Sequence, residues 1–335
     1  MRALLSVAAI LAASVLLAGC FEVKQDTSLN PDGSGKAVVE LTMPDMGAMA
    51  AGMTGMPGAV EKASPPDPEM ALKKFAKQTL DDSKGVEAWS DVSLARTEDG
   101  RMKFKGTAYF KDLTKLQIAN SKNDITWTKD EKGGMILKAA PPQDRPKPPA
   151  AKPEKPMTDE EIAQAVKEAR DQYIQGRPMM EMVFSKMKMA MKYRLPGTLA
   201  EVNGFTREAD GSVAFAFDGA KILETMDKLM ADEAYLTACI KAGQKPGGDA
   251  MSPEIMEKTF GFKGDIMARV TGNLKPLFDY AAEVKAAKEA YPKMIEKLGL
   301  DKVPPPAHIS VSPQMPPGMP PMPPAPENAP PAAQP

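Results

Sequence analysis

The placement of proline limits how much of this chain can fold into packed secondary structure. Of the 33 prolines, 7 lie between Pro141 and Pro156 and 14 more lie between Pro304 and Pro335. Because proline lacks a backbone N–H and has a fixed φ, such segments cannot form helix interiors or central strands. We therefore expect a proline-rich linker at 141–156 and a disordered proline-rich tail at 303–335. Two segments remain, 21–140 and 157–302, and each is expected to be an α+β domain, the second richer in helix.

Acidic and basic residues are almost balanced, and histidine is nearly absent. The chain has 43 Lys and Arg, 44 Asp and Glu, and one histidine, His308, which lies in the tail. The charge balance excludes the broad basic surface of a general nucleic-acid binder, so we expect no nucleic-acid partner. Because this single histidine lies in the proline-rich tail, we expect that the chain alone can assemble neither a His-based triad nor a multi-histidine metal site.

The first twenty residues form the most specific motif of the chain. Met1-Arg2 is a short positive segment, residues 3–17 are apolar but too short for a comfortable membrane span, and Leu17-Ala18-Gly19-Cys20 follows. This order resembles the lipobox of bacterial lipoproteins. The resemblance implies that residues 1–19 are a signal peptide cut by signal peptidase II and that the Cys20 thiol carries a diacylglycerol, with palmitate a typical acyl chain. An ordinary cleaved signal, or an apolar anchor helix with an incidental cysteine, is the alternative.

The resemblance also implies a location. Two or three acyl chains on Cys20 would hold the chain stably at a membrane, facing the periplasm or the cell surface. Phe21 follows the cysteine, whereas an aspartate at this position is the usual signal for inner-membrane retention in enteric bacteria, so the outer membrane is favoured. Strand-like alternation begins at once after Cys20, and at about 3.3 Å per residue it leaves almost no tether. We expect the first domain to sit on the bilayer surface.

Alternating apolar and polar residues predict three β-hairpins in the first segment. Residues 21–29 and 37–43 flank the turn cluster 30–35, which contains two glycines. A second hairpin turns at 98–100, and a third pair of strands, 125–128 and 135–137, surrounds 131–134. Asp67-Pro68-Glu69 is a helix start, with a capping side chain and a first-turn proline.

The second segment combines hairpins with amphipathic helices. Thr158 and Glu161 form a capping box, and Asp218 precedes a helix with apolar residues at 3.6 spacing. We expect strands at 187–193, 213–217 and 265–270 and a long final helix at about 277–298. The fold class is therefore α+β, with antiparallel β-hairpins and sheets and packed helices. Whether the two segments share one sheet across the linker is left open.

The opening hairpin, Phe21 to Met43 around Asn30-Pro31-Asp32-Gly33-Ser34-Gly35, follows directly on Cys20. In this it resembles the domains of LppM-like envelope lipoproteins, in which an N-terminal strand enters a small α+β domain at once. The resemblance implies an envelope-associated fold and carries no catalytic residues with it.

Methionine is unusually frequent, with 25 residues against 19 aromatics. Thioethers are soft ligands that select Cu(I), which makes a Met-rich copper-binding lipoprotein the second functional hypothesis. The metal candidates are Met43, Met46, Met49, Met53 and Met56, whose spacing fits one face of a helix. A second cluster comprises Met179, Met180, Met182, Met187, Met189 and Met191, and a third Met315, Met319 and Met322. Core packing by a flexible side chain is the favoured interpretation of these clusters.

Two further features have a structural and a functional interpretation. Lys186, Lys188, Lys192 and Arg194 share one face of a strand, which is either a solvated face or a surface for anionic headgroups. Cys239 lies in a helical pattern and is expected to be a buried, inert thiol rather than a reactive one.

These observations lead to one main hypothesis and two alternatives. The main one is a lipid-anchored envelope protein that acts as a non-enzymatic binding or structural module, with an envelope protein or a lipid as partner. Cu(I) binding is one alternative. The other is an envelope enzyme without a recognisable motif, because the chain contains no Walker loop, dinucleotide fingerprint, Gly-x-Ser-x-Gly or HExxH sequence. We assign no catalytic and no cofactor-binding residues.

Overall fold

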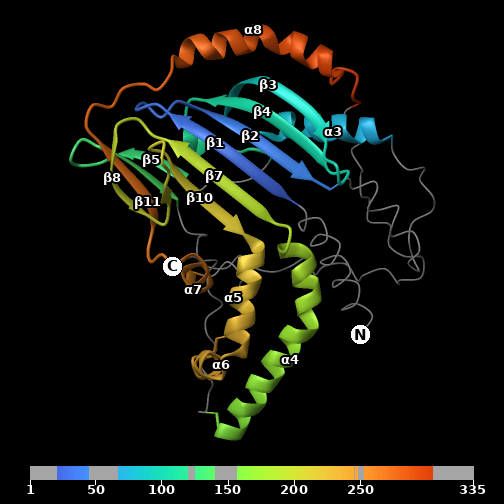
Figure 1. Cartoon of the computed structure of the whole chain (residues 1–335), viewed down its shortest axis with the longest axis vertical. Helices are drawn as coiled ribbons and strands as arrows, with labels where there is room; N and C mark the ends of the chain where they lie inside the picture. Colours follow the sequence, from blue (N-terminus) through green and yellow to red (C-terminus); the bar gives the residue numbers. More distant parts are fainter. Residues whose placement is uncertain are drawn as a thin grey trace, which may run out of the picture. The chain divides into compact units, whose positions relative to one another are not determined.

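The structure is a computed structural model that describes residues 21–44, 67–119, 125–139, 157–244, 246–247 and 253–304. Two β-sheets and several packed helices make up this part of the chain (Figure 1). The α+β class is confirmed. The linker 141–156 lies outside the described residues, as does the tail beyond Pro304.

The three hairpins of the first segment form as the alternation predicts. β1 (Glu22–Leu29) pairs with β2 (Gly35–Met43), β3 (Val86–Arg96) pairs with β4 (Met102–Phe110), and β5 (Ile125–Lys129) pairs with β6 (Met135–Ala139), all antiparallel. β2 also pairs with β4, so the first two hairpins are neighbours in one sheet.

The large sheet has seven strands in the order β3-β4-β2-β1-β7-β10-β9. β7 (Lys188–Arg194), β10 (Val213–Asp218) and β9 (Thr206–Arg207) come from beyond the linker. The strand pairs of the two sheets are antiparallel, as predicted, except for β1 and β7, which pair in parallel. A parallel pair cannot be joined by a tight turn, and here a long stretch of chain, which includes five strands and the helices α3 (Pro68–Asp82) and α4 (Asp159–Phe184), lies between the two.

The small sheet has four strands in the order β5-β6-β11-β8, where β8 is Thr198–Asn203 and β11 is Ile266–Thr271. β6 and β11 pair antiparallel across the linker. The segments 21–140 and 157–302 therefore share both sheets, which answers the question that the sequence left open. The division at the linker, expected as a domain boundary, does not follow the sheets.

Helices begin where side chains cap them. Asp67 accepts a hydrogen bond from the Glu69 amide before α3 (Pro68–Asp82), and Thr158 and Glu161 form the capping box of α4 (Asp159–Phe184). Asp218 caps α5 (Gly219–Ala231), which is followed by α6 (Glu233–Lys241) and α7 (Pro253–Phe260). α8 (Tyr280–Leu298) begins three residues later than predicted because Asp279 accepts a hydrogen bond from the Ala282 amide. Leu113–Lys115 form a short 3₁₀ helix.

One face of the large sheet supplies the main core. Leu29, Val39, Phe104, Phe110 and Tyr193 are fully buried there, together with side chains of the small sheet such as Leu137 and Val270. Figure 1 shows α8 lying along β3, the edge strand, and hydrophobic residues in its last two turns pack against the same core. A second cluster forms where α4, α5 and α7 meet the ends of β7 and β10.

Candidate functional site

Strand register fixes what surrounds Phe21, the residue that follows Cys20 in the sequence. Cys20 itself lies outside the described residues, but it is bonded to Phe21, the first residue that the structure describes. The Phe21 carbonyl accepts a hydrogen bond from the Lys188 amide at 3.2 Å, and Glu22 is paired with Lys188 in the parallel register. We call the end of the large sheet at which β1 and β7 begin the proximal end. The N-terminus of the described chain is therefore held beside β7.

The face of the large sheet opposite the main core is strongly polar. Alternate residues of β1, β2, β4 and β7 point to it, since Lys24 pairs with Glu40, Glu40 with Lys105, and Asp26 with Lys192. These side chains form ion pairs along and across the strands: Lys24 Nζ lies 3.1 Å from Glu22 of the same strand, and Lys103 Nζ of β4 lies 2.8 Å from Glu40 of β2. The hydrogen bond from Lys103 lowers the pKa of Glu40 below its ordinary value, against the opposing effect of burial.

Only half of the basic surface predicted on β7 is free of carboxylates. Lys192 Nζ lies 2.7 Å from Asp210, and an Arg194 nitrogen lies 2.7 Å from Asp26. The pKa of Asp210 is well below its ordinary value, chiefly because of the hydrogen bond from Lys192 and those from Ser212. Lys186 and Lys188 are exposed and have no carboxylate partner in the described part of the chain. The two lysines nearest Phe21 are thus the two that remain unpaired.

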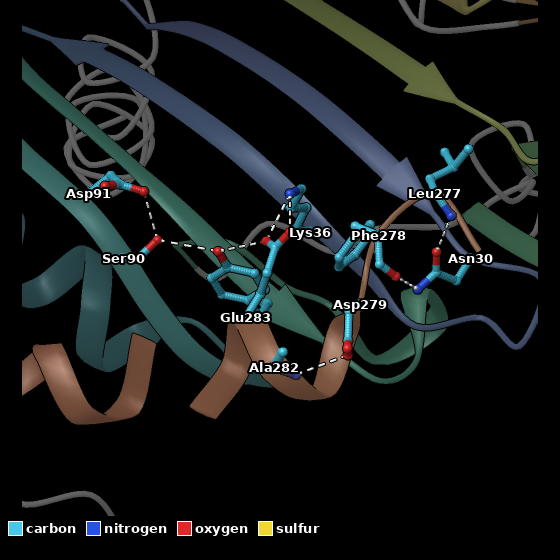
Figure 2. A network of polar contacts seen from close by, with 10 residues as sticks. Asn30, Lys36, Ser90, Asp91, Leu277, Phe278, Asp279, Ala282 and Glu283 are labelled. Carbon is cyan, nitrogen blue, oxygen red and sulfur yellow. Dashed lines mark hydrogen bonds and ion pairs between the residues drawn. The ribbon is translucent and has the colours of Figure 1, made fainter. Parts of the chain in front are cut away.

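A polar network fastens α8 to this face (Figure 2). Lys36 of β2 donates to both carboxylate oxygens of Glu283, each at 2.8 Å, and the Tyr109 hydroxyl donates to Glu283 at 3.1 Å. The Lys36 ammonium also lies 4.4 Å from the centre of the Phe278 ring. Burial, and then the neighbouring Glu283 carboxylate, raise the pKa of Tyr109. Tyr109 is therefore a hydrogen-bond donor near neutral pH and not a base.

Asn30 is the second connection between α8 and the sheets. Its side-chain oxygen accepts from the Leu277 amide at 2.8 Å and its side-chain nitrogen donates to the Phe278 carbonyl at 3.4 Å (Figure 2). Its main-chain carbonyl accepts from the Trp127 indole at 3.1 Å, which brings in the small sheet. Asn30 is only 3% exposed, so these bonds satisfy a polar group that is removed from water.

A cavity of about 250 Å³ lies between α8, α3 and β3. Leu80, Trp89 and Tyr291 line it together with Glu87 and Lys288. Glu87 is already bound by the Lys111 ammonium at 3.0 Å and by the Tyr280 hydroxyl at 3.0 Å, and the Lys111 hydrogen bond in particular lowers its pKa. A carboxylate held ionised in this way is not suited to act as a general acid near neutral pH.

The methionine candidates are only partly within the described structure. Met43 is the last residue of β2, so it does not continue the helical spacing predicted from Met43 to Met56. Met46, Met49, Met53 and Met56 lie outside the described residues, as does the third cluster. Copper binding by this segment stays a prediction of the sequence.

The other sulfur-containing residues can be placed. Four methionines of the second group are packed against hydrophobic residues, as the core-packing interpretation requires: Met180, Met187 and Met189 in the cluster formed by α4, α5 and α7, and Met191 against the main core. Met179 is the exception and is 51% exposed. Cys239 is buried in α6, as predicted. Among the described residues, no group of three or more His, Cys, Asp or Glu side chains is arranged to hold a metal ion.

The network around Glu283 was not predicted from the sequence. Lys36 and Glu283 are separated by 247 positions, and neither lies in a recognisable motif. Asn30 was identified only as part of a turn. Its partners Leu277 and Phe278 lie in the segment expected to begin the last helix.

Comparisons with known proteins add little. No family model matches the chain, and no curated protein is significantly similar to it. Among solved structures, the chain is similar to the folded domain of the Mycobacterium tuberculosis LppM protein, with 10% identity, a TM-score of 0.25, and coverage of 60% of this chain and 84% of that one. That domain is of the kind that the opening hairpin resembles. A TM-score of 0.25 assigns neither a shared fold nor a function.

Within the described part of the chain, each helix is too short or too polar to cross a membrane.

Proposed function

We propose that this chain is a lipid-anchored protein of the bacterial cell envelope that acts as a non-enzymatic binding or structural module at the membrane surface. The observation that carries the proposal is the sequence Leu17-Ala18-Gly19-Cys20, followed after one residue by β1 at Glu22. An acylated Cys20 would attach the large sheet to the bilayer through Phe21 alone.

The attachment makes the orientation of the sheet part of the function. Phe21 is hydrogen-bonded to Lys188, so the anchor would enter a seven-stranded sheet near its middle rather than a free strand. A sheet attached through so short a connection stays close to the bilayer surface. The ion-paired polar face, with α8 fastened across one part of it, is a surface that an envelope protein or a lipid headgroup would meet.

The resemblance to lipoproteins also supports a location. Lipoproteins of this type face the periplasm or the cell surface, and Phe21 after the cysteine favours the outer membrane over the inner membrane.

The test is a comparison of the two cysteines of the chain. Cells that produce wild type, Cys20→Ser or Cys239→Ser would be fed an alkyne analogue of palmitate. A fluorescent dye would be coupled to the alkyne, and the dye fluorescence and intact mass of each purified protein would be measured. Cys239 is the matched control, because it is buried in α6. We expect wild type and Cys239→Ser to lack residues 1–19 and to carry a diacylglyceryl group, and Cys20→Ser to carry neither change. A wild-type chain with no acyl mass on its Cys20 peptide contradicts the proposal.

A further inference from the structure

Large hydrophobic side chains are exposed in one region of α4. Ile174 is 61% exposed and Met179 is 51% exposed. Among the described residues only one other large hydrophobic side chain is comparably exposed, Leu277 at 45%. Single exposed hydrophobic residues need no explanation, but two within five positions of one helix form a local apolar surface.

Four exposed residues in this part of α4 are uncharged. Ile174, Gln175, Pro178 and Met179 are all exposed, and at 100° per residue they span about 140° of the helix circumference. Earlier turns of the helix expose charged residues instead, namely Lys167, Glu168 and Asp171.

The charged residues in the last turns of α4, Arg177 and Glu181, form an ion pair, although the Glu181 side chain is 64% exposed. Arg177 makes two hydrogen bonds to Asp227 of α5, at 2.7 and 2.9 Å, and one to Glu181 at 3.1 Å. Tyr173 donates to the same Asp227 at 2.6 Å. These contacts hold α4 against α5 and fix which side of α4 remains open.

This surface lies close to the start of the described chain. α4 ends at Phe184, whose carbonyl accepts a hydrogen bond from the Met187 amide, and the next residue, Lys188, donates to the Phe21 carbonyl. At about 1.5 Å per residue, Met179 is roughly 8 Å and Ile174 roughly 15 Å along the helix from Phe184. Cys20 is one Cα–Cα step, about 3.8 Å, beyond Phe21. Acyl chains on Cys20 would therefore enter the bilayer beside this end of α4.

Two unpaired cations complete the arrangement. Lys186 and Lys188 follow α4 directly, are exposed, and have no carboxylate partner in the described part of the chain. Apolar side chains next to lysines are the composition of protein surfaces that rest on anionic membranes, where the apolar groups enter the headgroup–acyl boundary and the lysines contact headgroups.

We propose that Ile174, Pro178 and Met179 of α4, together with Lys186 and Lys188, form a docking surface for the anionic bilayer that holds the acyl chains of Cys20. This inference rests on the proposed lipid anchoring and adds an orientation to it. The proximal end of the large sheet and the C-terminal half of α4 face the membrane, while the turn at Asn30 faces away. β1 places that turn about 23 Å from Glu22, at about 3.3 Å per residue.

The test measures the depth of a nitroxide on the lipidated, full mature chain in vesicles of phosphatidylethanolamine and phosphatidylglycerol. The label is attached to Met179→Cys or, as matched control, to Leu277→Cys, the exposed hydrophobic position beside Asn30. Cys239 is buried and stays unlabelled in the folded chain. We expect the label at 179 to relax faster with membrane-dissolved oxygen than with a water-soluble nickel chelate, and the label at 277 to show the reverse. Equal, water-like accessibility at both positions overturns the proposal.

A charge variant tests the lysines. Lys186→Gln with Lys188→Gln is compared with Lys129→Gln with Lys132→Gln, an equal change of charge at exposed positions of the hairpin β5–β6. We expect the first pair of substitutions to lower the ratio of docked to undocked chain roughly thirtyfold, the factor that two lysines provide near an anionic surface, and the second pair to leave it unchanged. An equal response of both variants overturns the role of Lys186 and Lys188.

The two proposals fail in different ways. If the Cys20 peptide of the purified chain has no acyl mass, the lipid anchor and the docking surface are both refuted. If the acyl mass is present but the label at 179 stays in water, only the docking surface is refuted. If the acyl mass is present and the label at 179 is protected from both relaxing agents, a protein covers the surface and the docking proposal is likewise refuted.

Discussion

The Lys36 ammonium lies 2.8 Å from both carboxylate oxygens of Glu283, so β2 and α8 are joined by a bidentate ion pair. The two side chains are 29% and 33% exposed, and Tyr109 donates a third hydrogen bond to the same carboxylate. This contact lies on the polar face of the large sheet, where α8 has few apolar partners: Val284 and Ala287 against Ala88 and Tyr109. The N-terminal half of α8 therefore depends on polar contacts more than its C-terminal half does.

Glu283→Gln is expected to loosen the start of α8. The substitution removes the charge that Lys36 and Tyr109 face, and for a partly exposed pair we expect the free energy of unfolding to fall by about 1 kcal/mol. Hydrogen exchange of the amides in 282–290 should accelerate, whereas that of β1 should not. Glu289→Gln is the control, because Glu289 is an exposed residue of the same helix with no ion pair in the described structure. Equal effects of the two substitutions would contradict a specific role for Glu283.

Asn30→Ala is expected to be more costly than its position in a turn suggests. It removes the acceptor of the Leu277 amide and the donor to the Phe278 carbonyl in a site that is almost closed to water. Leaving these groups unpaired should lower the free energy of unfolding by about 2 kcal/mol, as measured by urea denaturation. Asn273→Ala, at an exposed position of the loop that contains Leu277 and Phe278, should change the free energy of unfolding by less than about 0.5 kcal/mol. If Asn30→Ala lowers the free energy of unfolding no more than the control does, the hydrogen bonds of Asn30 to Leu277 and Phe278 do not stabilise the fold.

Local structure was largely predictable from the sequence, and long-range structure was not. The alternation in 21–43 gave the strands because a sheet with one buried face requires a period of two, and the caps at Asp67, Thr158 and Asp218 gave helix starts because they satisfy free amides within three residues. The parallel pairing of β1 with β7, which places Glu22 opposite Lys188, depends on contacts across the linker, for which the residues carry no local signal. The same is true of Lys36 and Glu283.

Acid should weaken the contact between α4 and α5. Hydrogen bonds from Arg177, and then from Tyr173, hold the pKa of Asp227 below its ordinary value of about 3.9. A depressed carboxyl pKa contributes stability that is present above the ordinary value and is lost as the pH falls through the lower, folded-state pKa. The difference in free energy of unfolding between wild type and Asp227→Asn should therefore be constant from pH 7 to about pH 5 and shrink below about pH 4.

Urea titrations at several pH values would measure this difference. Asp171→Asn is the matched control, since Asp171 is exposed on α4 and makes no ion pair in the described structure. A difference for Asp227→Asn that does not vary with pH would mean that the neutral asparagine fails for steric reasons and that the Arg177 pair contributes nothing electrostatic.

Two glycine-to-alanine substitutions should change the free energy of unfolding in opposite directions. Gly35 begins β2, and a Cβ there would meet the Phe110 ring, with its Cε2 atom at 2.7 Å, and the Ser28 carbonyl oxygen at 2.8 Å. Neither can move easily, because Phe110 is fully buried and Ser28 belongs to the paired strand β1, so Gly35→Ala should lower the free energy of unfolding by about 1–3 kcal/mol. Gly176 lies inside α4, where a Cβ would meet no atom within 4 Å. Gly176→Ala should raise the free energy of unfolding by about 0.5–1 kcal/mol, because alanine loses less backbone entropy in a helix. Urea denaturation of both variants would measure these changes. A stabilised Gly35→Ala would show that position 35 is not packed tightly against Phe110.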